Sequence, residues 1–214
     1  MEDVLEVYHR PYDPARPVVC MDEKSKELHA EVRPPEPCRP AQDPRPGVPA
    51  KRDSEYQRNG TANLFIWFEP LTGKRRLQVT ERRTGIDWAR SLQQLVDEEY
   101  AAAEKIVLVM DNLNTHKLGY LYETFSPAEA RRIAAKLEIH YTPKHGSWLN
   151  MAEIELSVLG RQCLNRRIKD RERLQQEVAA WETDRNARAS AMEWHFTTAD
   201  ARVKLKRLYP TLPD

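Results

Sequence analysis

The chain has 214 residues, and its 34 lysines and arginines against 33 acidic residues give a formal net charge of +1. This balance excludes a uniformly cationic surface for nucleic acid but leaves local basic patches open. No apolar run of the sequence approaches the roughly 18 residues of a membrane-spanning helix. The length fits one domain, or one domain with a short appendage. Three cysteines without a CxxC pair indicate reduced thiols and a cytoplasmic protein.

The first third of the sequence predicts an N-terminal arm without a strand, three strands and a long insertion. Residues 1–16 are acidic and proline-bearing, without the apolar stretch of a signal peptide. Apolar and alternating patterns predict strands at residues 17–22, 63–68 and 74–81, which can pair as a meander. Residues 33–59 hold seven prolines and few apolar side chains. Because proline removes backbone donors and forbids a helix interior, this stretch is expected to be an extended loop.

From Gly85 the apolar period changes to that of alternating helices and strands. The apolar run 105–110 lacks polar alternation, which is typical of a parallel strand covered on both faces. Ser126 and Pro127 predict a helix start within the helical region. The order indicates a mixed α/β sheet with helices on its faces. The predicted elements are helices at 85–104, 117–136, 147–164 and 170–188, strands at 105–110 and 137–142, and a basic tail.

Two apolar strands of this pattern each run into an aspartate, Asp22 and Asp111. The carboxyl ends of parallel strands gather at one edge of an α/β sheet, where function concentrates. If the two strands are parallel neighbours, their carboxylates lie close together and repel unless a cation sits between them. Aspartate is also an ordinary turn residue, so each position taken alone has a purely structural explanation.

A third acid lies on the helix predicted from residue 147. Its apolar stripe leaves Glu153 on one flank and Glu155 on the other, each about 80° from the centre of the stripe. Either side chain can reach the edge of the sheet. Periodicity does not choose between them.

Three motifs resemble the DDE transposases of the Tc/mariner superfamily, most closely the bacterial insertion-sequence-six-thirty group. They read Asp22-Glu-Lys, Val-Met-Asp111-Asn-Leu-Asn-Thr-His116 and Tyr-Thr-Pro-Lys-His-Gly-Ser-Trp-Leu-Asn150-Met-Ala-Glu153. The resemblance implies an RNase H-like catalytic domain over residues 17–175, with a five-stranded mixed sheet, followed by a C-terminal helix and basic tail at 176–214. The family's Asn-x-x-Glu pattern falls on Asn150 and Glu153, and so it selects Glu153 as the third acid.

The resemblance implies Mg²⁺-dependent cleavage and strand transfer of DNA, with Asp22, Asp111 and Glu153 as catalytic and metal-binding residues. Two divalent ions can activate the entering oxygen and stabilise the leaving oxygen of an in-line displacement at phosphorus. Mg²⁺, with Mn²⁺ as a substitute, takes few carboxylates together with water and substrate phosphate oxygens, so three acids suffice.

Several basic side chains are candidates for DNA contact. His116 follows Asp111 by five residues and is expected either to hydrogen-bond a phosphate or to lie at the end of a helix without contacting DNA. Lys144 and His145 precede the helix that bears the third acid, where a helix N-terminus favours a phosphate. A basic run is usually a solvated face, but in a nearly neutral chain its concentration favours a surface that follows phosphates. From that run we expect Arg161, Arg166 and Arg167 to contact DNA.

The family normally carries an N-terminal helix-turn-helix region, and only 21 residues precede Asp22. We therefore expect either a separately encoded reader subunit or a truncated remnant. The expected partners are transposon ends and target duplex, with a homodimer acting in the cytoplasm on the nucleoid. Two other functions stay open: an RNase H-like nuclease or resolvase without strand transfer, and a non-catalytic DNA-binding derivative of a transposase.

Overall fold

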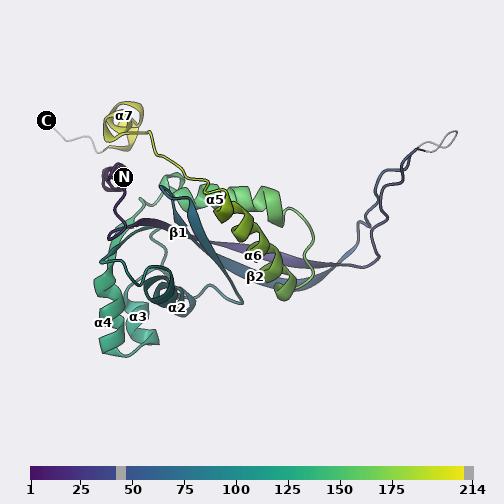
Figure 1. The fold of residues 1–214 in the computed structure, drawn as a ribbon, viewed down its shortest axis with the longest axis horizontal. Helices are drawn as coiled ribbons and strands as arrows, with labels where there is room; N and C mark the ends of the chain where they lie inside the picture. The colour runs from purple at the N-terminus through teal and green to yellow at the C-terminus, as the bar shows by residue number, and fades with distance from the viewer. Residues whose placement is uncertain (42–46, 210–214) are drawn as a thin grey trace.

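The computed structural model describes residues 1–41 and 47–209 and has a five-stranded mixed sheet at its centre (Figure 1). The strand order is β3-β2-β1-β4-β5, with antiparallel pairing from β1 to β3 and parallel pairing from β1 to β5. The fold class predicted from the sequence is confirmed. The strands are β1 (Val18–Glu31), β2 (Tyr56–Glu69), β3 (Lys74–Thr80), β4 (Ile106–Met110) and β5 (Leu137–Tyr141).

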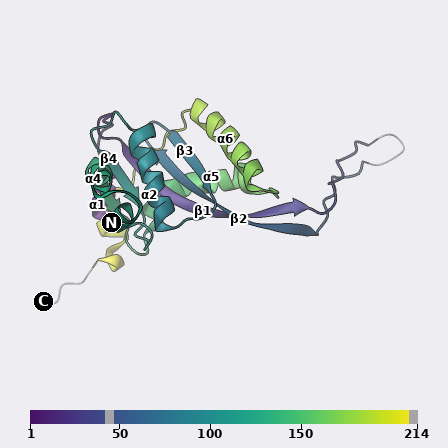
Figure 2. The same cartoon turned by 90° about the horizontal axis from the view of Figure 1, so that it is seen from below.

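Helices cover both faces of this sheet, as Figures 1 and 2 show. The helix predicted from residue 147 is composite, because a 3-10 turn (Ser147–Leu149) precedes α5 and a π turn (Gly160–Leu164) follows it. Ser126 caps α4 and Pro127 occupies its first turn, as predicted. The helices are α1 (Glu2–Tyr8), α2 (Gly85–Gln94), α3 (Gly119–Thr124), α4 (Pro127–Lys136), α5 (Met151–Leu159), α6 (Arg171–Ala187) and α7 (Thr198–Lys204).

Strand β1 separates two apolar layers through the alternation of its side chains. Cys20 and Leu28 belong to the layer beneath α5 and α6. Val19 and Met21 belong to the layer beneath α2 and α4. Even-numbered residues of the first part of β1 therefore face α5, and odd-numbered residues face α2.

The prediction that β1 ends at Asp22 is wrong. The strand continues to Glu31 because β2 pairs with it from Cys20, opposite Phe68, to Glu31, opposite Tyr56, with one register shift between Glu27 and His29. The parallel pairing with β4 does stop early, at Cys20 opposite Val109.

The extended part of β1 and β2 leaves the body of the molecule and leads into a long arm, seen at the right of Figure 1. Two antiparallel bridges, Glu36 with Lys51 and Arg39 with Val48, join the two sides of the arm. This agrees with the extended insertion predicted from the prolines. Residues 42–46 of that insertion lie outside the described residues.

Residues 1–16 contain helix α1, whereas the sequence predicts an N-terminal arm there, a segment separate from the β1–β2 arm. Val4, Leu5 and Val7 are fully buried in the same apolar layer as α5. The described residues include no helix with the length and apolarity to cross a membrane.

Candidate active site

Asp22 and Asp111 emerge at the same level of the sheet. Cys20 pairs in parallel with Val109, and each aspartate stands two positions further along its own chain. Strand β4 ends at Met110, whereas β1 continues with β2 alone on one side. The two aspartates therefore flank the gap that opens where the parallel pair ends.

Glu153 lies in the first turn of α5 and its side chain is exposed. Glu155 is fully buried, with Arg75 at 3.3 Å and Arg185 at 2.7 Å from its carboxylate. The structure thus separates the two glutamates that periodicity left equivalent. Glu155 belongs to a buried ion-pair cluster, and Glu153 is the acid of this helix that solvent or a ligand can reach.

Asn150 ties the start of α5 to β1. Its Oδ1 accepts a hydrogen bond from the amide of Ala152 at 3.1 Å and so caps the helix. Its Nδ2 donates to the carbonyl of Met21 at 2.8 Å, directly before Asp22 in the chain. The Asn150 carbonyl accepts from the amide of Glu153 at 3.0 Å. One buried residue therefore fixes the distance between the backbones that bear Asp22 and Glu153.

The environment of Asp22 is unfavourable for its charge. Burial raises the pKa of Asp22 to about 7, and the nearby charges of Glu23, Asp111 and Glu153 act in the same direction. A hydrogen bond from the Glu23 amide to Oδ1 at 2.8 Å offsets part of this effect. Within the described part of the chain, neither Asp22 nor Glu153 forms an ion pair. This corner of the site thus carries negative charge that a cation would compensate.

Glu23 was missed by the sequence analysis, although strand alternation turns it to the face opposite Asp22. There it lies 3.1 Å from His116 Nε2, and Asp111 Oδ1 lies 2.6 Å from His116 Nδ1. Burial by itself lowers the pKa of His116, but the hydrogen bonds to Asp111 and Glu23 outweigh it and raise that pKa to about 10. The ring therefore lies between two carboxylates as an ion-pair partner, and its Nδ1 donates a hydrogen bond to the backbone carbonyl of Asp111 at 3.2 Å.

His116 does not take the place expected of a DNA contact. Its side chain is 1% exposed and stacks against Trp88 at 5.7 Å between ring centroids. A phosphate cannot reach a ring enclosed in this way, so the expectation of direct contact is wrong. One ligand atom each of Glu23, Asp111 and His116 lies within 4.8 Å of the others, a spacing that a metal ion also accepts.

The other expected DNA contacts differ in accessibility. Lys144, His145 and Arg161 are exposed. Arg166 is paired with Glu177, and Arg167 lies 2.6 Å from Glu31.

Arg167 also donates to the backbone carbonyls of Ser54 and Glu55 and stacks on Tyr56, which anchors the base of the arm. Its position is that of a structural residue whose charge is already shared. The sequence run could not show this, because the pairing carboxylates come from β1 and α6.

Comparisons with known proteins identify the family and the fold of the chain. Residues 17–175 match the family model described as DDE superfamily endonuclease. The chain belongs to this family of DDE endonucleases. No curated protein matched the chain.

The fold is similar to that of two solved mariner structures. One is the Mos1 strand transfer complex, with a TM-score of 0.57 and 17% identity, covering 87% of this chain and 54% of that one. The other is the Mos1 mariner paired end complex with Mn, with a TM-score of 0.55 and 16% identity, covering 87% and 55%. The chain thus spans about half the length of each of these proteins. The Tc/mariner-type fold is confirmed, and the narrower insertion-sequence branch stays a prediction.

Proposed function

We propose that this protein is a transposase catalytic domain that cleaves DNA and joins the cut end to a target, with Asp22, Asp111 and Glu153 as its catalytic acids. The observation that carries the proposal is their convergence. Two come from neighbouring parallel strands and stand at one level of the sheet. The third lies on a helix whose first turn is bonded to the backbone beside Asp22. Family membership supports endonuclease chemistry in particular.

The donor set fits hard divalent cations. Asp22, Asp111 and Glu153 offer oxygen ligands, which Mg²⁺ and Mn²⁺ prefer, and the charge around Asp22 lacks a positive partner among the described residues. These three side chains would hold two ions. When bound, such ions lower the pKa of water and stabilise charge on the oxygens around phosphorus.

The chain's own residues orient these acids. His116 holds Asp111 in two ways, since its Nδ1 donates to the backbone carbonyl of Asp111 at 3.2 Å and lies 2.6 Å from Oδ1 of the carboxylate as an ion pair. Asn150 holds the backbones of Met21 and Glu153 in register. Both orienting residues are 1% exposed, so the constraint persists without substrate.

The proposed partners are transposon-end and target DNA in the cytoplasm, at the nucleoid. A homodimer is part of the proposal. The two matched Mos1 structures are a strand transfer complex and a paired end complex, which supports a DNA partner for this chain as well.

Nicking of supercoiled plasmid tests the chemistry without knowledge of the end sequence. With Mn²⁺ or Mg²⁺ the protein should convert supercoiled DNA to nicked and linear forms, and Asp111→Asn should lower this rate at least a hundredfold. Labelled oligonucleotides with a free 3′-hydroxyl should become joined to the plasmid. Asp184→Asn, which changes an exposed aspartate on α6, is the matched control.

The outcomes separate the three functions. Joining together with nicking supports a transposase, whereas nicking alone supports a nuclease or resolvase. DNA binding without metal-dependent nicking would identify a non-catalytic derivative. Near wild-type nicking by Asp111→Asn would show that the acids are wrongly assigned.

A further inference from the structure

We propose that the backbone of bound DNA follows β1, from the catalytic acids to a guanidinium-lined pocket at the base of the arm. The inference rests on the proposed function, since it takes DNA as the substrate. It adds the direction in which the DNA leaves the active site and names the side chains that meet its phosphates.

The first step of this path is on β1 itself. Asp22, Lys24 and Lys26 alternate along the strand and therefore face the same side, toward α5. The ammonium of Lys24 lies over the end of α5, where a Cβ added to Gly160 would be 3.7 Å from Nζ. Lys26 donates from Nζ to the carbonyls of Leu164 and Arg166.

A cleft of about 370 Å³ opens at this point. Lys24, Lys26 and Arg161 line it, and the other lining residues are Ser157, Gly160, Leu164 and Asn165. Lys24 and Arg161 are exposed, and neither is paired with a carboxylate anywhere in residues 1–41 or 47–209. The cleft therefore presents uncompensated positive charge directly beyond the acids.

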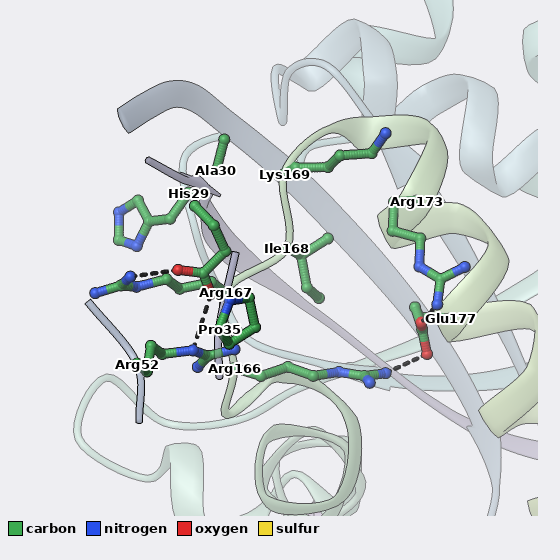
Figure 3. Close-up of a pocket in the computed structure, with 11 residues that line it drawn as sticks. His29, Ala30, Pro35, Arg52, Arg166, Arg167, Ile168, Lys169, Arg173 and Glu177 are labelled. Atoms are coloured by element: carbon green, nitrogen blue, oxygen red, sulfur yellow. Dashed lines mark hydrogen bonds and ion pairs between the residues drawn. The ribbon is translucent and has the colours of Figure 1, made fainter. Parts of the chain in front are cut away.

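The second step is a cavity of about 460 Å³ between the end of β1, the base of the arm and the segment before α6 (Figure 3). The amide of His29 donates to the carbonyl of Ile168 at 2.8 Å, so this segment lies directly beside β1. The charged side chains that line the cavity are Arg52, Arg166, Arg167, Lys169 and Arg173, with the carboxylates of Glu31 and Glu177.

The cavity has more guanidinium groups than carboxylates to pair with them. Glu31 is shared by Arg52 at 2.8 Å and Arg167 at 2.6 Å. Glu177 is likewise shared by Arg166 and Arg173. Four arginines thus share two carboxylates, which leaves two positive charges uncompensated. Arginine binds phosphate through two parallel hydrogen bonds, so this lining suits phosphodiester groups.

The spacing along the path fits a duplex. Nine residues of strand separate Asp22 from Glu31, which corresponds to about 30 Å at 3.3 Å per residue. Nucleotides of one strand are spaced about 3.4 Å along the helix axis, so the distance is close to one helical turn of about 34 Å, after which the same strand faces the protein again. The cleft with Lys24 and Arg161 lies between the two ends.

Fluorescence anisotropy with a labelled 30-base-pair duplex in EDTA tests the path without cleavage. Two double variants remove charge from it: Lys24→Gln with Arg161→Gln in the cleft, and Arg52→Gln with Arg173→Gln in the pocket. Each should weaken binding about tenfold at 0.1 M salt. Each should also flatten the dependence of log affinity on log salt by roughly 0.9 for every phosphate that the variant no longer neutralises.

The matched control is Arg90→Gln with Arg131→Gln, which removes two exposed charges from α2 and α4 on the other face of the sheet. Its affinity and salt dependence should equal those of the wild type. Lys169→Glu is a second pocket variant, since its side chain is 68% exposed and the change leaves the core intact. It should weaken binding as well.

The path is wrong if the wild-type protein binds and nicks DNA while the pocket variants bind the duplex unchanged. It is also wrong if the pocket variants weaken the binding of inorganic phosphate and leave the binding of the duplex unchanged, because the pocket would then be a site for a free anion. Absence of both binding and nicking in the wild-type protein would instead contradict the proposed function.

Discussion

At the residue scale, Asp22 is the side chain whose environment conflicts most with its charge. Its carboxylate is partly buried, and the charges of Glu23, Asp111 and Glu153 all disfavour its ionised form. When such a carboxylate ionises without a counter-ion, the free energy of unfolding of the protein decreases. The same arrangement gives high affinity for a cation, because the cation reverses that decrease.

Asp22→Asn should stabilise the metal-free protein at alkaline pH and leave it unchanged at acid pH. The folded-state pKa of about 7 lies above the ordinary value of 3.8, so the protonated form is favoured on folding. Stability from this group is fully present below pH 4 and is lost as the pH rises through 7. At pH 8 in EDTA the variant should be more stable by up to about 4 kcal/mol, since the shift is about three pKa units and each unit corresponds to about 1.4 kcal/mol.

Thermal melts between pH 4 and pH 8 measure this difference. Addition of Mg²⁺ at pH 8 should raise the melting temperature of the wild-type protein and close the gap, and should have little effect on the variant. A difference in stability that does not change with pH would show that the Asp22 carboxylate is not in the unfavourable environment described.

At the element scale, α5 carries two glutamates that are two residues apart and have different roles. Glu153 belongs to the candidate active site, and Glu155 belongs to the core. Glu155 faces Arg75, whose side chain is also fully buried, and Arg185. Removal of one partner from a buried ion pair leaves an uncompensated charge, which typically costs about 3 to 5 kcal/mol. Glu153 has no such partner in the described ranges, so it is free for a ligand.

Glu155→Gln and Glu153→Gln should therefore have opposite effects. Glu155→Gln should lower the free energy of unfolding by about 3 kcal/mol, because Arg75 loses its buried counter-charge. Glu153→Gln should leave unfolding within about 0.5 kcal/mol of the wild type and abolish metal-dependent nicking. Urea denaturation and the plasmid assay measure the two effects. Loss of nicking in a fully folded Glu155→Gln protein, with activity retained in Glu153→Gln, would reverse the assignment.

Much of the element pattern could be predicted because it depends on local signals. The uninterrupted apolar run of β4 and the Ser126-Pro127 helix start both fold as the sequence indicates. Helical periodicity could not separate Glu153 from Glu155, since both lie at the same angle from the apolar stripe. The choice depends on Arg75 and Arg185, which belong to β3 and α6 and reach the helix only through tertiary packing.

The basic run before α6 shows the same limit. Its composition predicts a phosphate-binding surface, but Glu31 and Glu177 neutralise part of it from other elements. The length of β1 could not be predicted either, because the polar half of the strand is held by pairing with β2 and not by burial.

At the scale of the whole molecule, the N-terminal helix α1 contacts the start of α5, the helix that carries Glu153. The hydroxyl of Tyr8 donates to the carbonyl of Leu149 at 2.6 Å and accepts from the amide of Met151 at 3.4 Å. These two residues flank Asn150, which bonds to β1. Near the other end of the chain, Arg202 of α7 pairs with Glu2 of α1. The helices near the two ends of the chain thus meet on the side that supports the start of α5.

Tyr8→Phe should weaken both the fold and the affinity for divalent ions. The ring still fills its site, so the main loss is the buried hydrogen bond to Leu149, worth about 1 to 2 kcal/mol of unfolding free energy. Without this bond the turn around Asn150 is less constrained, and the Mn²⁺ dissociation constant should rise severalfold. Urea denaturation and calorimetric Mn²⁺ titration measure the two quantities. Tyr122→Phe, at a side chain exposed on α3, is the control that should change neither. A Tyr8→Phe protein with reduced stability but unchanged Mn²⁺ affinity would show that α1 supports the core without influencing the acids.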